Sequence, residues 1–377
     1  ESAYRDFVAL ADPGDFIAVR GGLIQTKTGE LTVAATTWQM LAKALRPLPD
    51  KFHGLKAHEL RYRKRYLDVL VNPAVRQLFE RRTRFIQALR RFLDGHGFLE
   101  VETPVLELVT GGAEAEPFVT RHRTLDVDLY LRISLELHLK RLIIAGFDRV
   151  YEIGKVFRNE GMSPEHLQEF TELEFYQAYA DYHDLQRFVP ACYRTALEET
   201  FGTLQFPFQG TTLKFDSPWA VVDYTEGLKR AGGVDIVGAD VRALHHALDR
   251  RQIAYPPSAG RGRLIDLLYK KTLRPSLVQP TFVINHPVDV SPLAKRHRDH
   301  PELTERITVV VAGCEVGNGF SELNDPIDQR QRFEQQAKLR AAGDREAQMT
   351  DEDFLEALEH GMPPTAGFGV GIDRLFM

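Results

Sequence analysis

The sequence predicts an α+β fold in which an antiparallel β-sheet is flanked by helices. The strongest observation is an alternating run at residues 150–158 that stops at a loop and resumes at 170–176, the pattern of a long β-hairpin. Two further strand-like runs, 307–312 and 316–322, follow each other near the C-terminus. Segments with helical periodicity precede and follow these strands, which completes the prediction of a mixed fold.

The N-terminal residues read as β-structure followed by a linker. Short strand-like runs at 15–20 and 30–35 are joined by a turn-rich stretch at 26–29. The prolines that follow fix φ and remove hydrogen-bond donors, which is typical of a connection between domains. We therefore divide the chain into an N-terminal domain at 1–48, a linker at 49–60 and a main domain at 61–377.

A long amphipathic helix begins the main domain. Asn72 and Pro73 supply an N-cap and a first-turn proline, and Gly95 and Gly97 end the helix. The apolar positions at three- and four-residue spacing are Val75, Leu78, Phe79, Phe85, Ile86, Leu89, Phe92 and Leu93. The opposite face has five arginines, Arg81, Arg82, Arg84, Arg90 and Arg91. Alone, such a face is more often solvated than bound to nucleic acid.

The remaining elements follow in order. Residues 98–102 alternate and predict a strand that ends at Pro104, and a Gly-Gly loop leads to a strand at 128–133 and a helix at 136–145. Residues 183–300 mix helical and turn-rich segments. The C-terminal part contains a charged helix at 326–342 and a glycine-rich strand at 367–371 that leads into the first turn of a helix.

Composition excludes several classes of protein. The chain has 377 residues, 43% of them hydrophobic and 27% charged, and its net charge of −5 gives no overall basic footprint for nucleic acid. Cys192 and Cys314 lie far apart, so neither a disulfide framework nor a thiolate zinc site organises the fold. No apolar run approaches the ~18 residues that span a bilayer, and the first ten residues lack signal-peptide features. We expect a cytoplasmic protein without a membrane partner.

The long hairpin is the first candidate functional element. On its second strand Phe170, Glu172, Glu174 and Tyr176 share one face. If Arg158 points to that same face, one surface of the sheet presents an arginine, aromatic rings and carboxylates. The alternative is a hairpin with one solvent-facing polar side, which is common in antiparallel sheets.

Two glycine-containing strands are the next candidates. Gly367, Gly369 and Gly371 alternate, so positions without side chains line one face and let a ligand approach the backbone, unless they serve tight strand–helix packing. The run at 315–322 also alternates, with Glu315, Gly317, Gly319 and Ser321 on one side and Val316, Asn318, Phe320 and Glu322 on the other. Carboxylates and an amide beside glycines suit a polar ligand or a metal, or an edge strand with surface acids.

Together these segments offer what an enzyme needs to hold a nucleotide triphosphate and a cationic small molecule. The sequence contains no Ser/His/Asp set, no Gly-rich loop with GK[ST] and no HExxH, so serine-triad, P-loop and zinc-protease functions have no support. The glycines at 367–371 do not open a βαβ unit followed by an acid, which a dinucleotide fingerprint requires.

In their order along the chain, these motifs resemble those of the bacterial class II lysyl-tRNA synthetases. The three class signatures correspond to residues 84–104, 157–170 and 367–374. The stretches similar to that family in particular are 61–68, 322–326 and 361–364. By this resemblance, residues 1–48 are the second half of an anticodon-binding OB-fold β-barrel and 61–377 are the catalytic domain, so we expect a chain truncated at both ends.

The resemblance implies a fold and a reaction. The fold is a six- to seven-stranded antiparallel sheet with helices on one side, in a homodimer formed through the first signature. The substrates are lysine, ATP and lysine tRNA, with Mg²⁺ as the metal. Lysine and ATP react to lysyl-adenylate and pyrophosphate, and the lysyl group then passes to the terminal adenosine of the tRNA.

By the same resemblance, five residues bind ATP. Arg158 spans the lysine carboxylate and the α-phosphate. Glu160 accepts a hydrogen bond from the adenine amino group, and Phe170 and Arg374 sandwich the adenine ring. Arg374 also reaches the γ-phosphate, and His166 belongs to the same site. Arg158 and Arg374 are therefore the expected catalytic residues.

The resemblance also implies a lysine pocket. Glu136 and the backbone of Gly112 take the α-amine, and Asn318 lies near the carboxylate. The ε-ammonium is surrounded by Glu174, Tyr176 and Glu322, and its methylene stem is covered by Phe320. Independently of the family, these carboxylates favour a cationic side chain, because an acidic substrate would be repelled.

Some positions depart from the family pattern. Glu315 is expected to bind Mg²⁺, but Thr308 stands where the family commonly has a second acidic ligand. Leu167 and Gln168 replace the usual Asn-Pro of the second signature, and Glu116 stands where an arginine is common.

Two alternatives share the same motifs. One is the synthetase paralogue that attaches a lysine-like amino acid to elongation factor P, which also lacks a complete anticodon domain. The other is a non-catalytic relative that binds ATP or lysine. ATP–pyrophosphate exchange distinguishes the second alternative from both enzymes, and β-lysine as the amino acid distinguishes the first.

Overall fold

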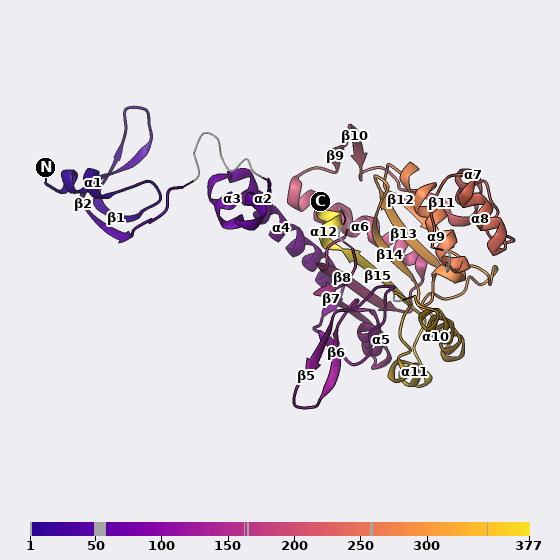
Figure 1. Ribbon diagram of the computed structural model, residues 1–377. Helices are drawn as coiled ribbons and strands as arrows, with labels where there is room; N and C mark the ends of the chain where they lie inside the picture. The colour runs from indigo at the N-terminus through magenta and orange to yellow at the C-terminus, as the bar shows by residue number, and fades with distance from the viewer. Residues whose placement is uncertain (1, 49–57, 162, 164–165, 257–258, 345) are drawn as a thin grey trace. The chain divides into compact units, whose positions relative to one another are not determined.

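The computed structural model describes residues 2–48, 58–161, 163, 166–256, 259–344 and 346–377 (Figure 1). The chain divides into two compact units, Glu1–Arg81 and Arg82–Met377. Most of the linker predicted at 49–60 lies outside the described residues.

The first unit contains the expected hairpin and a helix that was not expected. Strands β1 (Phe16–Gln25) and β2 (Leu31–Ala42) pair antiparallel, as the turn at 26–29 predicted. The prediction of β-structure throughout is wrong for α1 (Ser2–Leu10). This helix packs on the hairpin because the Phe7 ring meets the Trp38 ring edge-on at 5.4 Å and Trp38 Nε1 donates to the Ala3 carbonyl at 2.8 Å. The unit also includes α2 (His58–Arg63) and α3 (Arg65–Val71).

The second unit is built on a sheet of eight described strands in the order β11-β12-β13-β14-β15-β8-β7-β3. Their bounds are β3 (Leu99–Glu100), β7 (Arg149–Phe157), β8 (Glu169–Ala178), β11 (Ala220–Asp223), β12 (Thr281–Ile284), β13 (Arg306–Val311), β14 (Cys314–Ser321) and β15 (Thr365–Gly371). All neighbours from β12 to β7 are antiparallel, which confirms the α+β class. The expected sheet of six or seven antiparallel strands differs at its edges, where β11 and β3 pair in parallel.

Helices cover both faces of this sheet, whereas the resemblance led us to expect them on one side. Strand β8 shows why, since Leu173 and Phe175 enter one hydrophobic core while Tyr176 and Ala178 enter another. The first core is closed by α4 (Pro73–Gly95) and α6 (Tyr182–Phe201). The second lies under α5 (Glu136–Ile144), α10 (Pro326–Ala341) and α11 (Glu352–Glu359).

A third core stands beside the edge that β11 and β12 form (Figure 1). It is enclosed by α7 (Tyr224–Gly232), α8 (Val241–Asp249) and α9 (Arg261–Lys271). These elements lie where the sequence predicted only a mixture of helical and turn-rich segments.

Smaller elements complete the unit. A three-stranded sheet contains β4 (Leu106–Glu107), β5 (Val119–His122) and β6 (Val127–Leu131), and a hairpin contains β9 (Gln205–Phe208) and β10 (Thr211–Lys214). The short turns η1 (Arg274–Ser276) and η2 (Val288–Val290) flank β12, and α12 (Ile372–Phe376) follows β15. None of the described helices is long and apolar enough to cross a membrane.

The arginine face of α4 is only partly solvated. Arg82 donates to Oδ1 of Asp373 at 2.7 Å and to the Thr171 hydroxyl at 3.2 Å. Arg90 and Arg91 form ion pairs with acidic side chains of the same unit. The prediction of a solvated face therefore holds for Arg90 and Arg91, whose side chains are exposed although paired, and is wrong for the half-buried Arg82; all three tie α4 to the sheet or to α6.

Candidate active site

The register of the β7–β8 hairpin brings Arg158 onto the face with the carboxylates. Val156 pairs with Phe170 and no bulge interrupts the ladder, so even-numbered residues of both strands share a face. Arg158 directly follows β7. Its guanidinium carbon lies 5.1 Å from the centre of the Phe170 ring, its Nη2 is 3.9 Å from Oε1 of Glu172, and its Nε donates to the Ile133 carbonyl. The conditional placement of Arg158 is confirmed.

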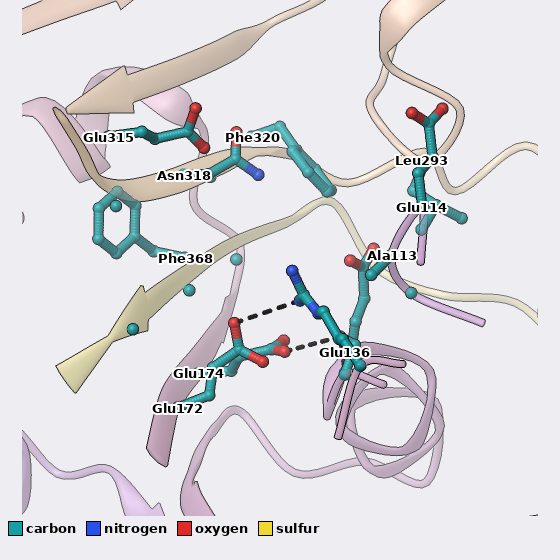
Figure 2. Close-up of a pocket in the computed structure, with 18 of the residues that line it drawn as sticks. Ala113, Glu114, Glu136, Glu172, Glu174, Leu293, Glu315, Asn318, Phe320 and Phe368 are labelled. Carbon is teal, nitrogen blue, oxygen red and sulfur yellow. Dashed lines mark hydrogen bonds and ion pairs between the residues drawn. The ribbon is translucent and has the colours of Figure 1, made fainter. Parts of the chain in front are cut away.

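One cavity of about 490 Å³ collects the predicted site residues. Every one of them lines it: Gly112, Glu136, Arg158, Glu160, His166, Phe170, Glu174, Tyr176, Glu315, Asn318, Phe320, Glu322 and Arg374. Figure 2 shows Glu315, Asn318 and Phe320 on one strand, across the cavity from Glu172 and Glu174. Residues from distant parts of the chain thus meet in one place, as the motif pattern predicted.

Glu174 is held in place by donors around the start of α5. Its Oε1 accepts hydrogen bonds from the Ser134 hydroxyl at 2.8 Å and the Leu135 amide at 2.9 Å, and its Oε2 accepts from the Tyr176 hydroxyl at 2.7 Å. The backbone amides at a helix N-terminus stabilise a carboxylate. Ser134 was not among the predicted site residues, although it lies just before the predicted helix.

Lys140 is the main residue that the sequence reasoning missed. It is fully buried, and its Nζ lies 2.6 Å from Oε1 of Glu136 and forms a second ion pair with Oε2 of Glu322. The one sequence signal is that Glu136 and Lys140 are four residues apart on a predicted helix. Oε1 of Glu322 is buried, and within the described part of the chain no donor hydrogen-bonds to it.

Three buried carboxylates of the cavity have raised pKa values, those of Glu136, Glu172 and Glu322. Burial, reinforced by Glu174, raises the pKa of Glu172 to about 8. Burial also raises the pKa of Glu136 to about 7, although Lys140 opposes the shift, and raises the pKa of Glu322 well above its usual range. Groups that desolvation drives toward the neutral form gain most when a cation enters beside them. The cavity therefore favours a positively charged ligand.

Gly367 is required by the side chains that cross its strand. A Cβ at this position would lie 2.2 Å from Oε1 of Glu322 and 2.3 Å from Cε1 of Tyr176. The absent side chain therefore makes room for two of the predicted lysine contacts. The prediction that the glycines of β15 open one face of the strand to the cavity is confirmed, since Gly369 and Gly371 also line it.

A β-bulge in β14 corrects the predicted faces of that strand. Val309 pairs with Gly317 but the next residue, Val310, pairs with Glu315, so one extra residue is inserted at Val316. The alternation predicted Glu315 and Asn318 on opposite sides. The bulge shifts the period and places both on the cavity side, as Figure 2 shows.

Two further residues orient the cavity wall. Arg306 donates from Nε to the Asn318 side-chain oxygen at 2.8 Å. This hydrogen bond fixes the amide group so that its nitrogen points away from Arg306. Asp373 accepts from the Thr171 amide at 2.7 Å while it pairs with Arg82, and its neighbour Arg374 donates to the Glu315 carbonyl at 3.0 Å. Neither Arg306 nor Asp373 was predicted to belong to the site.

The positions that depart from the family pattern have definite contacts. Gln168 donates to the Glu160 carbonyl at 3.1 Å and so closes the base of the loop, while Leu167 is 58% exposed. His166 shares a hydrogen bond with the Ser163 hydroxyl. Thr308 is buried and shares a hydrogen bond of 3.0 Å with Nε2 of His286.

Comparison with known proteins gives the family. A family model of the class II tRNA synthetases for D, K and N matches residues 57–377. The lysine–tRNA ligase of Moorella thermoacetica is 50% identical over 372 residues, which cover 97% of this chain and 75% of the relative. The lysine–tRNA ligase of Thermosynechococcus vestitus is 49% identical, with 100% of this chain and 75% of the relative covered. For that of Thermotoga maritima, the identity is 50% and the coverage 97% and 72%.

The fold, the site and the family model agree on the class: this is a class II tRNA synthetase. Within the class, the chain belongs to the lysine–tRNA ligase family and is an enzyme of that kind.

Proposed function

We propose that the cavity activates L-lysine with ATP, giving lysyl-adenylate and pyrophosphate, and then transfers the lysyl group to the 3′ end of lysine tRNA. The observation that carries the proposal is that several buried carboxylates line the same cavity as Arg158, Arg374 and Phe170. The carboxylates match a cationic amino acid, and the arginines and the ring match a nucleotide triphosphate.

The lysine substrate is assigned between α5 and β14. Glu136 and the carbonyl of Gly112 bind its α-amine, and the Asn318 amide lies near its carboxylate. Glu174, Tyr176 and Glu322 surround the ε-ammonium, with Phe320 over the methylene stem. The unpartnered Oε1 of Glu322 supports this assignment, because a buried carboxylate oxygen without a donor is costly until a ligand supplies one.

The adenylation step needs positioning and charge stabilisation more than acid–base chemistry. The lysine carboxylate is already a nucleophile, so no general base has to act on it before it attacks the α-phosphate. Arg158 joins the two reacting groups, and Phe170 and Arg374 hold the adenine, with Glu160 and His166 along the same wall. Pyrophosphate leaves as the new carboxyl–phosphate bond forms.

Lysine-dependent ATP–pyrophosphate exchange tests the proposal. We expect exchange with L-lysine and much slower exchange with arginine and β-lysine. A preference for β-lysine would instead identify the elongation factor P paralogue. Binding of lysine and ATP without any exchange would identify the non-catalytic relative. Charging of lysine tRNA then tests the second step.

The residues of the cavity fit a magnesium ion that arrives with the nucleotide. Glu315 offers a hard oxygen donor, but the described residues include no cluster of three acidic, histidine or cysteine side chains that could hold a metal alone. When bound, Mg²⁺ neutralises phosphate charge. We predict that Glu315→Gln raises the Mg²⁺ concentration for half-maximal exchange about tenfold, measured by magnesium titration, while Glu334→Gln on the exposed face of α10 leaves it unchanged. An unchanged Mg²⁺ requirement would contradict the assignment.

The raised carboxyl pKa values predict how lysine affinity depends on pH. At neutral pH Glu172, with a pKa of about 8, is mostly protonated in the free enzyme, and Glu136, with a pKa of about 7, is about half protonated; both lose protons when a cation binds. Affinity should therefore rise between about pH 6 and 8, by up to about tenfold per pH unit for each proton released. Calorimetry in two buffers of different ionisation enthalpy checks this, and a flat profile or proton uptake would contradict it.

We propose a homodimer through the first signature, residues 84–104, with the turns of α4 just before that signature included in the interface. Leu78 and Phe79 were expected to be buried, yet they are 53% and 49% exposed in this single chain. We propose that a second copy covers them. Leu78→Asp should convert the dimer to a monomer in size-exclusion chromatography with light scattering, and Gln87→Asp, on the opposite side of the helix, should not. A monomeric unaltered protein at micromolar concentration would contradict the proposal.

The proposed function also includes a domain organisation and a cellular location. Residues 1–48 are assigned to the anticodon-binding OB-fold domain, with the linker at 49–60 and the catalytic domain at 61–377. The enzyme is assigned to the cytoplasm, where ATP and tRNA are available, and not to a membrane.

A further inference from the structure

Lys140 lies between two carboxylates that are assigned to opposite ends of the lysine substrate. Its side chain is fully buried, with Nζ 2.6 Å from Glu136 on α5 and in a second ion pair with Glu322, which follows β14. The rings of Phe320 and Phe354 lie 5.3 and 6.0 Å from Nζ. An ammonium that is shielded from water acts strongly on the charges beside it.

We propose that Lys140 is a positioning residue for lysine binding: its ammonium favours the ionised forms of Glu136 and Glu322 and sets the span between them. The inference rests on the proposed assignment of these carboxylates to the α-amine and the ε-ammonium. Because the two carboxylates come from separate elements, their spacing depends on a group that contacts both, and Lys140 is such a group.

The charges around Lys140 explain why its removal should affect the ligand. Glu172, Glu174 and Tyr176 face the cluster from β8, Arg306 on β13 acts on Glu136 from farther away, and the Phe354 ring of α11 lies near the ammonium. Without the ammonium, the buried carboxylates of Glu136 and Glu322 repel each other more strongly and take up protons instead. Lysine would then have to displace more protons in order to bind.

A purely structural ion pair makes a different prediction. If Lys140 only stabilised the contact between α5 and β14, its loss would lower the free energy of unfolding without separating lysine from ATP. A positioning role predicts a selective loss of lysine affinity and a displaced pH profile, which a change in stability does not produce.

Four variants test the inference in pyrophosphate exchange and lysine calorimetry. Lys140→Met should raise the KM for lysine by at least about tenfold, the size of one charged hydrogen bond, and leave the KM for ATP within about twofold. The pH at which lysine affinity stops rising should move upward by about one unit, because the pKa values of Glu136 and Glu322 rise when the ammonium is lost. Lys229→Met, which removes an exposed lysine paired with Asp235, is the matched control and should change neither quantity.

Lys140→Arg keeps the charge and provides a second test of the inference if the methionine variant does not fold. Its pH profile should stay in place, but the bulkier guanidinium alters the span, so discrimination between lysine and the shorter ornithine should fall. Normal lysine KM, pH profile and ornithine discrimination in the folded variants would overturn the inference. Glu322→Gln, measured in parallel, distinguishes failure of the Lys140 inference from failure of the proposed lysine pocket. If this variant also leaves lysine binding unchanged, the assignment of the pocket fails as well.

Discussion

Replacement of Arg158 by alanine should lower the rate of lysine-dependent exchange by about 10³-fold, the lower end of what an arginine contributes at a transferring phosphoryl group. Arg158 is held by the Ile133 carbonyl, faces Phe170 and lies near Glu172, so its guanidinium is positioned before any ligand enters. Pre-positioned charge of this kind acts on the transition state without reorganisation, and the loss should therefore appear in kcat more than in either KM.

Two controls make the Arg158 result interpretable. The conservative variant Arg158→Lys keeps a positive charge but loses the planar fork that bridges two groups, so it should recover only a small part of the rate. Arg187→Ala removes an exposed arginine of α6 and should leave exchange unchanged. An Arg158→Ala enzyme with near-normal kcat would show that another residue joins the lysine carboxylate to the α-phosphate.

Replacement of Glu322 by glutamine should weaken lysine far more than ATP. The glutamine keeps the shape but removes the charge that faces the ε-ammonium, and the loss of a buried charge partner costs about 2 kcal/mol or more. We expect the KM for lysine to rise at least about thirtyfold, with the KM for ATP within about twofold. Steady-state exchange with each substrate varied in turn measures both.

The control for Glu322 is Glu334→Gln, an isosteric change at an exposed position of α10. Equal losses for lysine and ATP in the Glu322 variant would refute the assignment of this carboxylate to the ε-ammonium. A loss confined to lysine would support the assignment and would make Tyr176 and Glu174 the next residues to vary.

The sequence predicted which residues of each hairpin strand share a face, but it left open whether Arg158 lies on the Phe170 face. The regular pairing of β7 with β8 decides this and places Arg158, Phe170 and Glu174 on one side. The same reasoning was wrong for Glu315, since the bulge at Val316 shifts the period by one residue. A bulge depends on the partner strand, which is distant in the sequence.

Lys140 was missed for a different reason. A glutamate and a lysine four residues apart on a helix normally indicate an exposed ion pair. Here the pair is buried because α5 lies against β8 and α11, and the third member, Glu322, arrives from far along the chain. The edge strand β11 and its neighbour β12 were missed because four residues are too few to show a period.

The glycine at position 367 has a consequence for how the specificity of this enzyme can change through mutation. Any side chain there would collide with both Glu322 and Tyr176, so no single substitution at this site can reshape the pocket by degrees. A variant lineage would first have to shorten one of those two side chains, and it would lose lysine recognition before it gained another amino acid. The intermediate variant would be inactive toward lysine and toward the new amino acid. The preference for lysine should therefore resist change by single mutations.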